Sequence, residues 1–449
     1  MKGKKNARDI AQSALYSVFC EGAYSNLGLR ALLNKYDPAP DDRALASELV
    51  YGVIQNYRLL DAYIAAFSKT PPEKLQRRAL IILRIAFYQL LFLDRIPESA
   101  AVNEAVKSAR RTLNAGAAGY VNAVLRAYLR DKSFKPNLPD DTTERLALEY
   151  SLPEWMARHF IKSYGDDAGA RIIRAVNDRP KIYIRRNAYR ASEEELSRAL
   201  SDEGASIEAS PALNGAYVFS GKGDPTRYRA FSRGMFFFQD ITSQLAAHAA
   251  GAREGGTVID MCAAPGAKSF AAAQYMNNKG TIFAFDIHEN RVGLIKDAAE
   301  RLGIDIIKPA PRDAAEFDAE LCETADAVIA DVPCSGLGTI AKKPDIRLKS
   351  EKELFSLPET QNKILKNASK YVKPGGTLVY STCTLNPAEN EDVVSAFLRE
   401  HKDFSAVSPE FPGVPKELTI RRGGTVTFLP DGNFGDGFFI AKLVKDKKV

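Results

Sequence analysis

The sequence has few cysteines, and none of them lies in a pattern that builds a scaffold. The five thiols are an odd number in a chain of 449 residues, and no C-x-x-C pair occurs. Disulfide frameworks use even sets of cysteines in short chains, and structural zinc sites need closely spaced ligands. We therefore expect a cytoplasmic chain with reduced thiols and no metal. The cysteines are Cys20, Cys262, Cys322, Cys334 and Cys383.

Long hydrophobic runs and the G-x-G-x-x-G fingerprint are also absent. The most apolar run, "ALIILRIAFYQLLFLDR", contains Arg84 and is too short to span a bilayer, so no membrane partner is expected. Without the fingerprint, a nicotinamide enzyme is disfavoured. The net charge of +6, from 62 basic and 56 acidic residues, permits a nucleic-acid partner, but an ordinary solvated surface explains it equally well.

The chain is too long for one core, and its patterns divide it into three regions. Residues 1–135 read as successive helices, with almost no strand-like alternation. Residues 136–233 begin as a proline-rich polar linker and continue as a small α+β module. Residues 234–449 alternate short apolar strands with helices, which predicts an α/β domain with a mostly parallel sheet, extended by a late hairpin.

The first strand of the third region ends in a loop that suits a bound nucleoside. It reads "VIDMCAAPGAKS", and the next strand ends on Asp286, 26 residues after Asp260. A glycine loop before a helix exposes backbone N–H groups, and a carboxylate at the next strand end can accept both ribose hydroxyls. A plain connection and a helix cap are the alternatives for each feature alone. Together they favour a nucleoside cofactor without a pyrophosphate, such as S-adenosylmethionine.

Two later strands each deliver a cysteine to that same edge of the sheet. Cys334 follows "VIADVP" and Cys383 follows "LVYST". Two core thiols or a redox pair are the alternatives. A thiolate that adds to carbon 6 of cytosine turns carbon 5 into a nucleophile that can accept a methyl group. Asp331, three residues before Cys334, is placed to hydrogen-bond the N3/N4 edge of the ring, and a base must finally remove the carbon 5 proton.

These motifs resemble those of the Sun-type RNA (cytosine-5) methyltransferases. The matching stretches are "CAAPGAK", "DVPCSG", "YSTCTLNPAENE" and "DGFFIAKL". The first 130 residues, with "ARDIAQSAL", "LRIAFYQL" and "GYVNAVLRAYL", look like the NusB RNA-binding helical domain. This pairing resembles the Sun-type enzymes that act on 16S ribosomal RNA, and it covers essentially the whole chain. It implies a Rossmann-like class I methyltransferase domain preceded by a NusB-like domain.

The resemblance also implies roles for single residues. Cys383 corresponds to the nucleophile, and Cys334 to the cysteine that assists release of the methylated product. Asp286 would meet the ribose, Asp313 the adenine, and Asp331 the methionine end of the cofactor. The loop that would hold the cofactor comprises Cys262, Ala263, Ala264, Pro265, Gly266, Ala267 and Lys268.

The chain departs from the family pattern at two positions. Ala267 replaces a second glycine of the cofactor loop, which is tolerable unless that position needs a positive φ. Leu348 stands where the family often has a tryptophan, which bears on base stacking.

Paired basic residues are expected to contact RNA phosphates, and such contacts fix the register of the RNA without reading its sequence. The pairs are Arg185 with Arg186 and Lys342 with Lys343.

Two other functions compete with this interpretation. A DNA cytosine-5 methyltransferase would use Cys334 as its nucleophile and leave Cys383 dispensable. A non-enzymatic RNA-binding assembly factor could keep an inactive methyltransferase domain. The "TC" motif argues against the first, and the intact Asp286, Asp331 and both cysteines argue against the second. We take a monomer as the default state.

Overall fold

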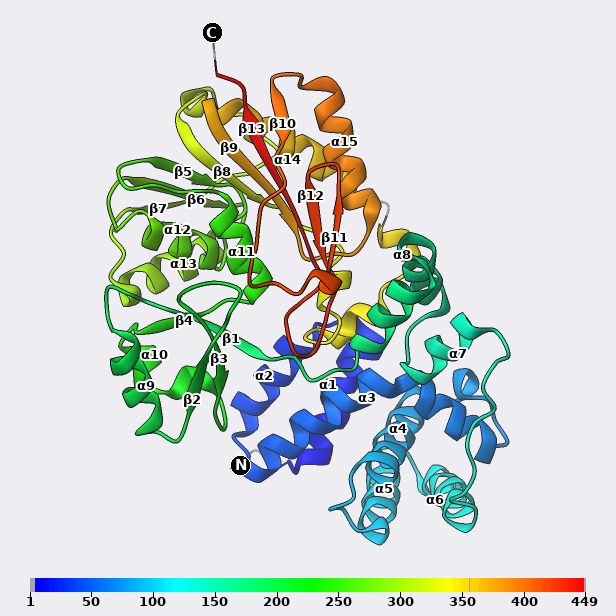
Figure 1. Cartoon of the computed structure of the whole chain (residues 1–449). Coiled ribbons are helices and arrows are strands. Elements are labelled where there is room, and N and C mark those ends of the chain that lie inside the picture. Colours follow the sequence, from blue (N-terminus) through cyan, green and yellow to red (C-terminus); the bar gives the residue numbers. More distant parts are fainter. Residues whose placement is uncertain (1–4, 355, 448–449) are drawn as a thin grey trace. The chain divides into compact units, whose positions relative to one another are not determined.

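The computed structural model describes residues 5–354 and 356–447 and divides into two compact units (Figure 1). The helical unit runs to Asn177 and also includes the segment Ile340–Lys349. The methyltransferase unit comprises Asp178–Thr339 and the chain from Ser350 onward. The chain therefore crosses from one unit to the other three times.

The helical unit is built from amphipathic helices around one core. In α1, the predicted stripe Ile10, Ala14, Leu15 and Val18 is buried, and the side chain of Asn6 caps the helix through the N–H of Asp9. No helix within the described ranges is long and apolar enough to cross a membrane. The helices are α1 (Ala7–Glu21), α2 (Ser25–Tyr36), α3 (Pro40–Phe67), α4 (Arg77–Phe92), α5 (Glu98–Thr112), α6 (Ala115–Arg130), α7 (Thr142–Glu149) and α8 (Glu154–Ala175).

The segment Ile340–Lys349 is held in the helical unit by a buried arginine. Arg347 is 0% exposed, and its guanidinium donates to the backbone carbonyls of Gln55 at 2.5 Å, Tyr150 at 3.2 Å and Val176 at 3.3 Å. Burial lowers the pKa of Arg347 to about 10, so it stays charged at neutral pH. Leu348, the departure from tryptophan, packs against the helical core, so a role in base stacking is not favoured.

The small module in the methyltransferase unit contains an antiparallel sheet in the order β2-β3-β1-β4. The predicted strands are β1 (Ile182–Arg186) and β3 (Ala216–Ser220), joined by the short β2 (Ser206–Ala209) and β4 (Phe236–Phe238). Helix α9 (Glu193–Ser201) begins with the capping box that its sequence predicts, because Ser192 and Glu195 satisfy each other's backbone N–H groups.

A larger mixed sheet organises the rest of the methyltransferase unit. Its order is β11-β12-β13-β9-β8-β5-β6-β7, with β10 beside β13. The run from β9 to β7 is parallel, and the predicted late hairpin, β12 and β13, joins β9 antiparallel. The strands are β5 (Thr257–Asp260), β6 (Thr281–Asp286), β7 (Ile307–Pro311), β8 (Ala325–Asp331), β9 (Val372–Thr382), β10 (Phe404–Ala406), β11 (Thr419–Arg422), β12 (Thr425–Phe428) and β13 (Phe438–Lys445).

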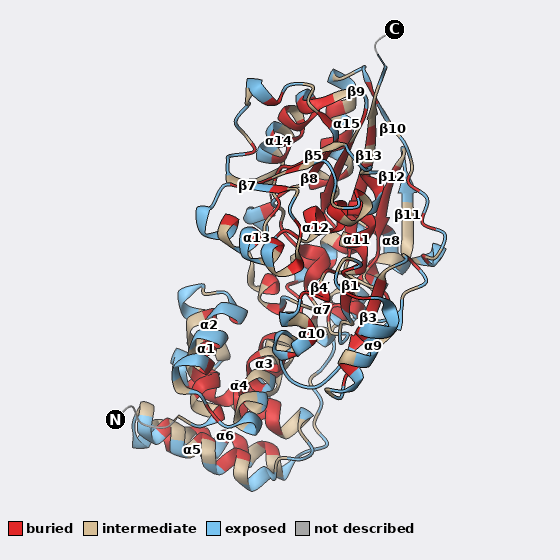
Figure 2. Ribbon diagram, turned by 90° about the vertical axis from the view of Figure 1, so that its left-hand side faces the viewer, coloured by how far each residue is buried: buried red, intermediate tan, exposed pale blue. Residues whose placement is uncertain are grey.

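Helices cover both faces of this sheet, and Figure 2 shows the strands buried between them. One core includes Leu245, Phe270 and Ile295, and the other includes Ile364 and Phe397. This arrangement confirms the predicted fold class. The helices of the first face are α11 (Ile241–Ala249), α12 (Ala267–Tyr275) and α13 (Glu289–Leu302), and those of the second are α14 (Leu357–Tyr371) and α15 (Glu391–Glu400).

Strand β7 is the one element of the parallel run that the sequence analysis missed. Its sequence, "IKPAP", contains Pro309 and Pro311, which cannot donate to a ladder. The strand pairs only with β6 and forms the edge of the sheet, so the missing donors leave no partner unsatisfied.

Arg347 generates a stability prediction. Replacing it with Met keeps much of the volume but leaves several buried carbonyls without donors, so we expect the free energy of unfolding to fall by about 2–4 kcal/mol. Calorimetric melting of the full chain checks this. Lys343→Ala, an exposed change in the same segment, is the control and should leave the transition unchanged; equal transitions for the two variants would contradict the assignment.

Candidate active site

The two candidate cysteines meet at the carboxyl edge of the sheet. Strands β8 and β9 are parallel neighbours, and Asp331 lies opposite Ser381 where they end. The following loops bring the sulfur atoms of Cys334 and Cys383 to 3.3 Å from each other. Both side chains are half-buried. Two thiols that are 49 residues apart in the chain thus form one site.

Asp331 is the centre of a polar network beside these thiols. Its carboxylate accepts from the Lys268 ammonium at 2.6 Å and from the Ser381 hydroxyl at 2.7 Å. The same ammonium donates to the Ser243 hydroxyl at 2.8 Å. Lys268 comes from the first turn of α12, so this network joins the predicted cofactor loop to the thiol loops. Ser243 and Ser381 were not among the predicted site residues, because a lone serine in a sequence carries little chemical signal.

The cofactor loop has the backbone that its sequence requires. Gly266 has a φ of +106°, and a Cβ there would lie 2.3 Å from the ring of Phe270. Both the backbone conformation and the lack of space therefore require glycine at this position. Ala267 is the first residue of α12 and has no positive φ, so its methyl group is accommodated. The N–H of Ala263 donates to the carbonyl of Phe285 at 2.6 Å, which ties the loop to β6.

The three carboxylates that follow β6, β7 and β8 lie at the same edge. Asp286 is 3% exposed, pairs with Arg291 at 3.1 Å and accepts from the N–H of His288. Asp313 is exposed and accepts from the N–H of Ala315 at 2.8 Å. Asp286 therefore has a fixed orientation, whereas Asp313 remains available to a ligand in solvent.

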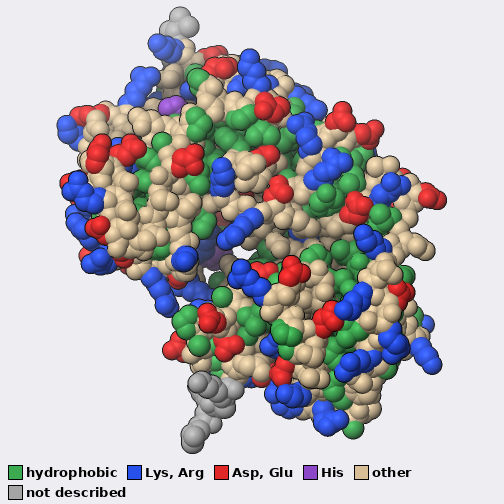
Figure 3. Space-filling model, turned by 60° about the horizontal axis from the view of Figure 1, so that its bottom comes forward, with side chains coloured by type: hydrophobic (Ala, Val, Ile, Leu, Met, Phe, Trp, Pro, Cys, Tyr) green, Lys and Arg blue, Asp and Glu red, His purple; other side chains and the backbone are tan. Residues whose placement is uncertain are grey.

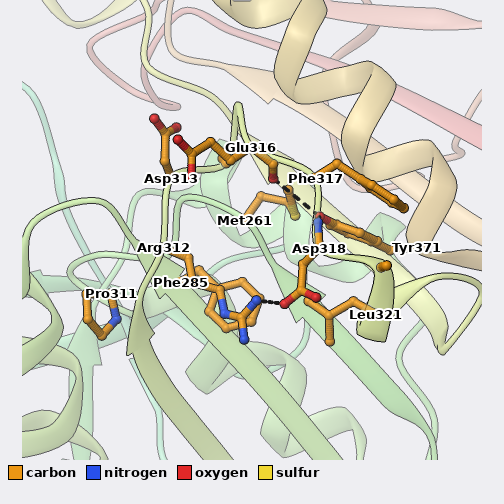
Figure 4. A pocket seen from close by; sticks show the side chains of 12 residues that line it. Met261, Phe285, Pro311, Arg312, Asp313, Glu316, Phe317, Asp318, Leu321 and Tyr371 are labelled. Carbon is orange, nitrogen blue, oxygen red and sulfur yellow. Dashed lines mark hydrogen bonds and ion pairs between the residues drawn. The ribbon is translucent and has the colours of Figure 1, made fainter.

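A cavity of about 450 Å³ opens beside this edge, under the segment that follows β7 (Figure 4). Of the residues predicted to bind the cofactor, Asp313 lines this cavity. An ion pair between Arg312 and Asp318 lies on its wall, and Phe317 stacks on Tyr371 with ring centroids 5.8 Å apart. The cavity therefore adjoins the Cys262–Lys268 loop without containing it.

Asp260, the last residue of β5, has an unused hydrogen-bonding atom. It is fully buried, its Oδ2 accepts from Ser269 at 2.7 Å, and its Oδ1 has no hydrogen-bond partner among the described residues. Burial raises the pKa of Asp260 to about 7, although Ser269 and Lys268 oppose the shift. A buried acceptor at the start of the cofactor loop fits the ammonium group of S-adenosylmethionine, so the residues present suit this cofactor.

The structure corrects the expectation of an RNA contact at Arg185. This side chain is 4% exposed, donates to Gln274 at 3.0 Å and lies over the ring of Tyr275 at 4.9 Å. Arg185 shares a buried face of β1 with Tyr183, and its partners Gln274 and Tyr275 belong to helix α12. Arg186 is half-buried and donates to the carbonyl of Ala191.

Lys342 and Lys343 lie in the segment that belongs to the helical unit, and Lys343 is exposed. On the face drawn in Figure 3, lysine and arginine side chains are interspersed with acidic ones, so charge does not mark an RNA footprint on that face.

Comparison with known proteins assigns all three regions. Family models match residues 5–130 as "NusB family", 152–224 as "Methyltr_RsmF/B-like, ferredoxin-like domain" and 248–444 as "16S rRNA methyltransferase RsmB/F". The chain is 37% identical over 445 residues to "Probable ribosomal RNA small subunit methyltransferase B" of Bacillus subtilis, covering 98% of this chain and 99% of the relative. The chain belongs to the RsmB/F methyltransferase family.

Further RsmB/F relatives extend over the same length. "Ribosomal RNA small subunit methyltransferase B" of Salmonella typhi is 30% identical over 448 residues, which cover 99% of this chain and 100% of that one. The crystal structure of PH0851 superposes with a TM-score of 0.81 at 28% identity and full coverage of both chains. S-adenosylmethionine is the methyl donor of this RsmB/F family.

Asp260 generates a prediction about pH. Its carboxylate must ionise to pair with the cofactor's ammonium group, and the free site holds a proton below a pH of about 7. The affinity for S-adenosylhomocysteine should therefore fall about tenfold for each pH unit below 7, with proton release on binding. Calorimetric titration between pH 5.5 and 7.5 measures this.

Asp260→Asn is the matched variant, since it removes the ionisable group and keeps the shape. It should bind more weakly at pH 7.5 and show almost no pH dependence below 7. A variant that keeps the wild-type pH profile would show that another group is responsible.

Proposed function

We propose that the chain transfers a methyl group from S-adenosylmethionine to carbon 5 of a cytosine in small-subunit ribosomal RNA. The observation that supports this most is the pair of sulfur atoms, 3.3 Å apart, beside Asp331 at the end of β8 and its ion-pair partner Lys268 of α12. Methyl transfer to an oxygen or an exocyclic nitrogen requires no thiol. Carbon 5 of cytosine is a poor nucleophile, and a thiolate that adds to carbon 6 makes it nucleophilic.

Cys383 acts as the nucleophile in this proposal. Its thiolate forms a bond to carbon 6, the electron pair of the 5,6 double bond moves to carbon 5, and carbon 5 takes the methyl group. Asp331 hydrogen-bonds the N3/N4 edge of the base, and the Lys268 ammonium holds its carboxylate in place. The bound cofactor supplies an electrophilic methyl group on its sulfonium.

Cys334 acts in the release of the product. The neighbouring Cys383 and burial both raise the pKa of Cys334, so it keeps its proton at neutral pH. After methyl transfer, a base takes the carbon 5 proton, the 5,6 double bond forms again, and the bond from carbon 6 to Cys383 breaks with its electron pair returning to the Cys383 sulfur. Cys334 assists this elimination.

The cofactor is held by the loop Cys262–Lys268, with Asp260 at its ammonium, Asp286 at its ribose and Asp313 at its adenine. Arg186, Lys342 and Lys343 remain the proposed phosphate contacts. A flipped or single-stranded cytosine is the expected target, since carbon 6 is inaccessible inside a duplex.

Single substitutions of the two thiols test the mechanism. Cys383→Ala should abolish methyl transfer, whereas Cys334→Ala should accumulate a covalent protein–RNA adduct, because bond formation persists and elimination fails. Labelled cofactor, 16S ribosomal RNA transcripts and denaturing gels give both readouts. If Cys334→Ala alone prevents adduct formation, the roles are reversed; if neither change matters, the cytosine-5 assignment is wrong.

A further inference from the structure

A buried carboxylate connects the two thiol loops. Glu389 lies in the one-turn helix Pro387–Glu389, six residues after Cys383, and is 0% exposed. Its Oε2 accepts from the N–H of Ser335 at 2.9 Å, and its Oε1 accepts from the Ser335 hydroxyl. Ser335 is the residue after Cys334. One side chain therefore fixes the loop of the other thiol by two hydrogen bonds.

The same carboxylate is itself held from two further directions. Gln361 of α14 donates to Oε2 at 2.9 Å and also to the carbonyl of Pro333, the residue before Cys334. Asn386 donates to Oε1 at 3.0 Å. Four neutral donors thus converge on Glu389, which fixes its orientation.

The two residues that flank Cys383 are held in place by Asn390, the residue that follows Glu389. Asn390 accepts from the Thr382 hydroxyl at 2.6 Å and donates to the carbonyl of Thr384 at 2.9 Å. The hydroxyls of Thr384 and Ser335 lie 2.6 Å apart, which closes the network between the loops. All of these polar side chains are buried, so the two thiol loops are joined by an internal hydrogen-bond network and not by solvent-exposed contacts.

We propose that Glu389 is a positioning residue that holds Cys334 where it can assist elimination of Cys383 from the methylated base. This inference rests on the proposed function. Glu389 holds the Cys334 loop through the backbone N–H and the hydroxyl of Ser335, and its negative charge also raises the pKa of Cys334. Its loss should leave attack by Cys383 largely intact and slow the release step.

Glu389→Gln is the decisive variant, because it preserves shape and replaces one acceptor with a donor. That donor would face the donors of Ser335, Gln361 or Asn386, and the Cys334 loop would shift. We expect the variant to form the protein–RNA adduct at close to the wild-type rate and to release it about 10- to 100-fold more slowly, as expected for a catalytic group moved by about 1 Å. Rapid-quench denaturing gels resolve the two rates.

Glu391→Gln is a matched control two residues away. Glu391 is half-buried, and its Oε1 accepts from the hydroxyl of Thr427 of β12. The same chemical change there should leave both rates unchanged. Equal release rates for Glu389→Gln and Glu391→Gln would overturn the inference.

Combining the change with Cys334→Ala separates positioning from general damage. If Glu389 acts through Cys334, the double variant should release the adduct no more slowly than Cys334→Ala alone. Effects that multiply would contradict the proposal. If Glu389→Gln does not fold, Ser335→Ala gives the same test, because it removes one of the bonds to Glu389 and keeps the backbone bond.

The proposed function and this inference fail in different ways. If Cys334→Ala accumulates no adduct, the two-thiol function is wrong whatever Glu389 does. If Cys334→Ala accumulates adduct while Glu389→Gln and Ser335→Ala release it at the wild-type rate, the function stands and the positioning role is wrong.

Discussion

The parallel pairing of β8 with β9 is the constraint on which the site depends. The ladder runs in register from Ala327 opposite Thr377 to Asp331 opposite Ser381, in the middle of a sheet covered on both faces. A slip of one residue would turn the buried side chains of a strand to the other face, so the register is strongly fixed. Because the strands are parallel, both following loops leave at one edge, and the two thiols meet there.

Three carboxylates at this edge of the sheet differ in their partners and in their burial. Asp331 lies between a lysine and a serine, Asp286 pairs with Arg291, and Asp260 is fully buried and accepts from Ser269. Carboxylates at one edge thus differ in orientation and exposure because their partners differ. In the proposed function, Asp286 meets the ribose, Asp260 the ammonium group and Asp331 the base.

The helical unit depends on a segment encoded inside the methyltransferase region. Arg347 donates hydrogen bonds to backbone carbonyls from three separate segments of the helical unit. The helical pattern of the sequence does not predict these contacts. The segment begins directly after the loop of Cys334, so the chain itself links the helical unit to the thiol loop. A deletion of the first 130 residues would remove Gln55, one of the carbonyl partners of the Arg347 guanidinium, and is therefore not a neutral truncation.

The sequence by itself determined the order of elements and the chemistry at each strand end. These features are local, so each can be predicted from a short segment of sequence. They are the apolar runs, the glycine loop and the positions of Asp286, Asp331, Cys334 and Cys383. Tertiary structure decided what depends on distant partners. Arg185 is internal because Gln274 and Tyr275 cover it, and β7 tolerates its prolines because it lies at an edge. Glu389 has its role only because Ser335 and Gln361, far away in sequence, turn their donors toward it, and no spacing rule encodes that convergence.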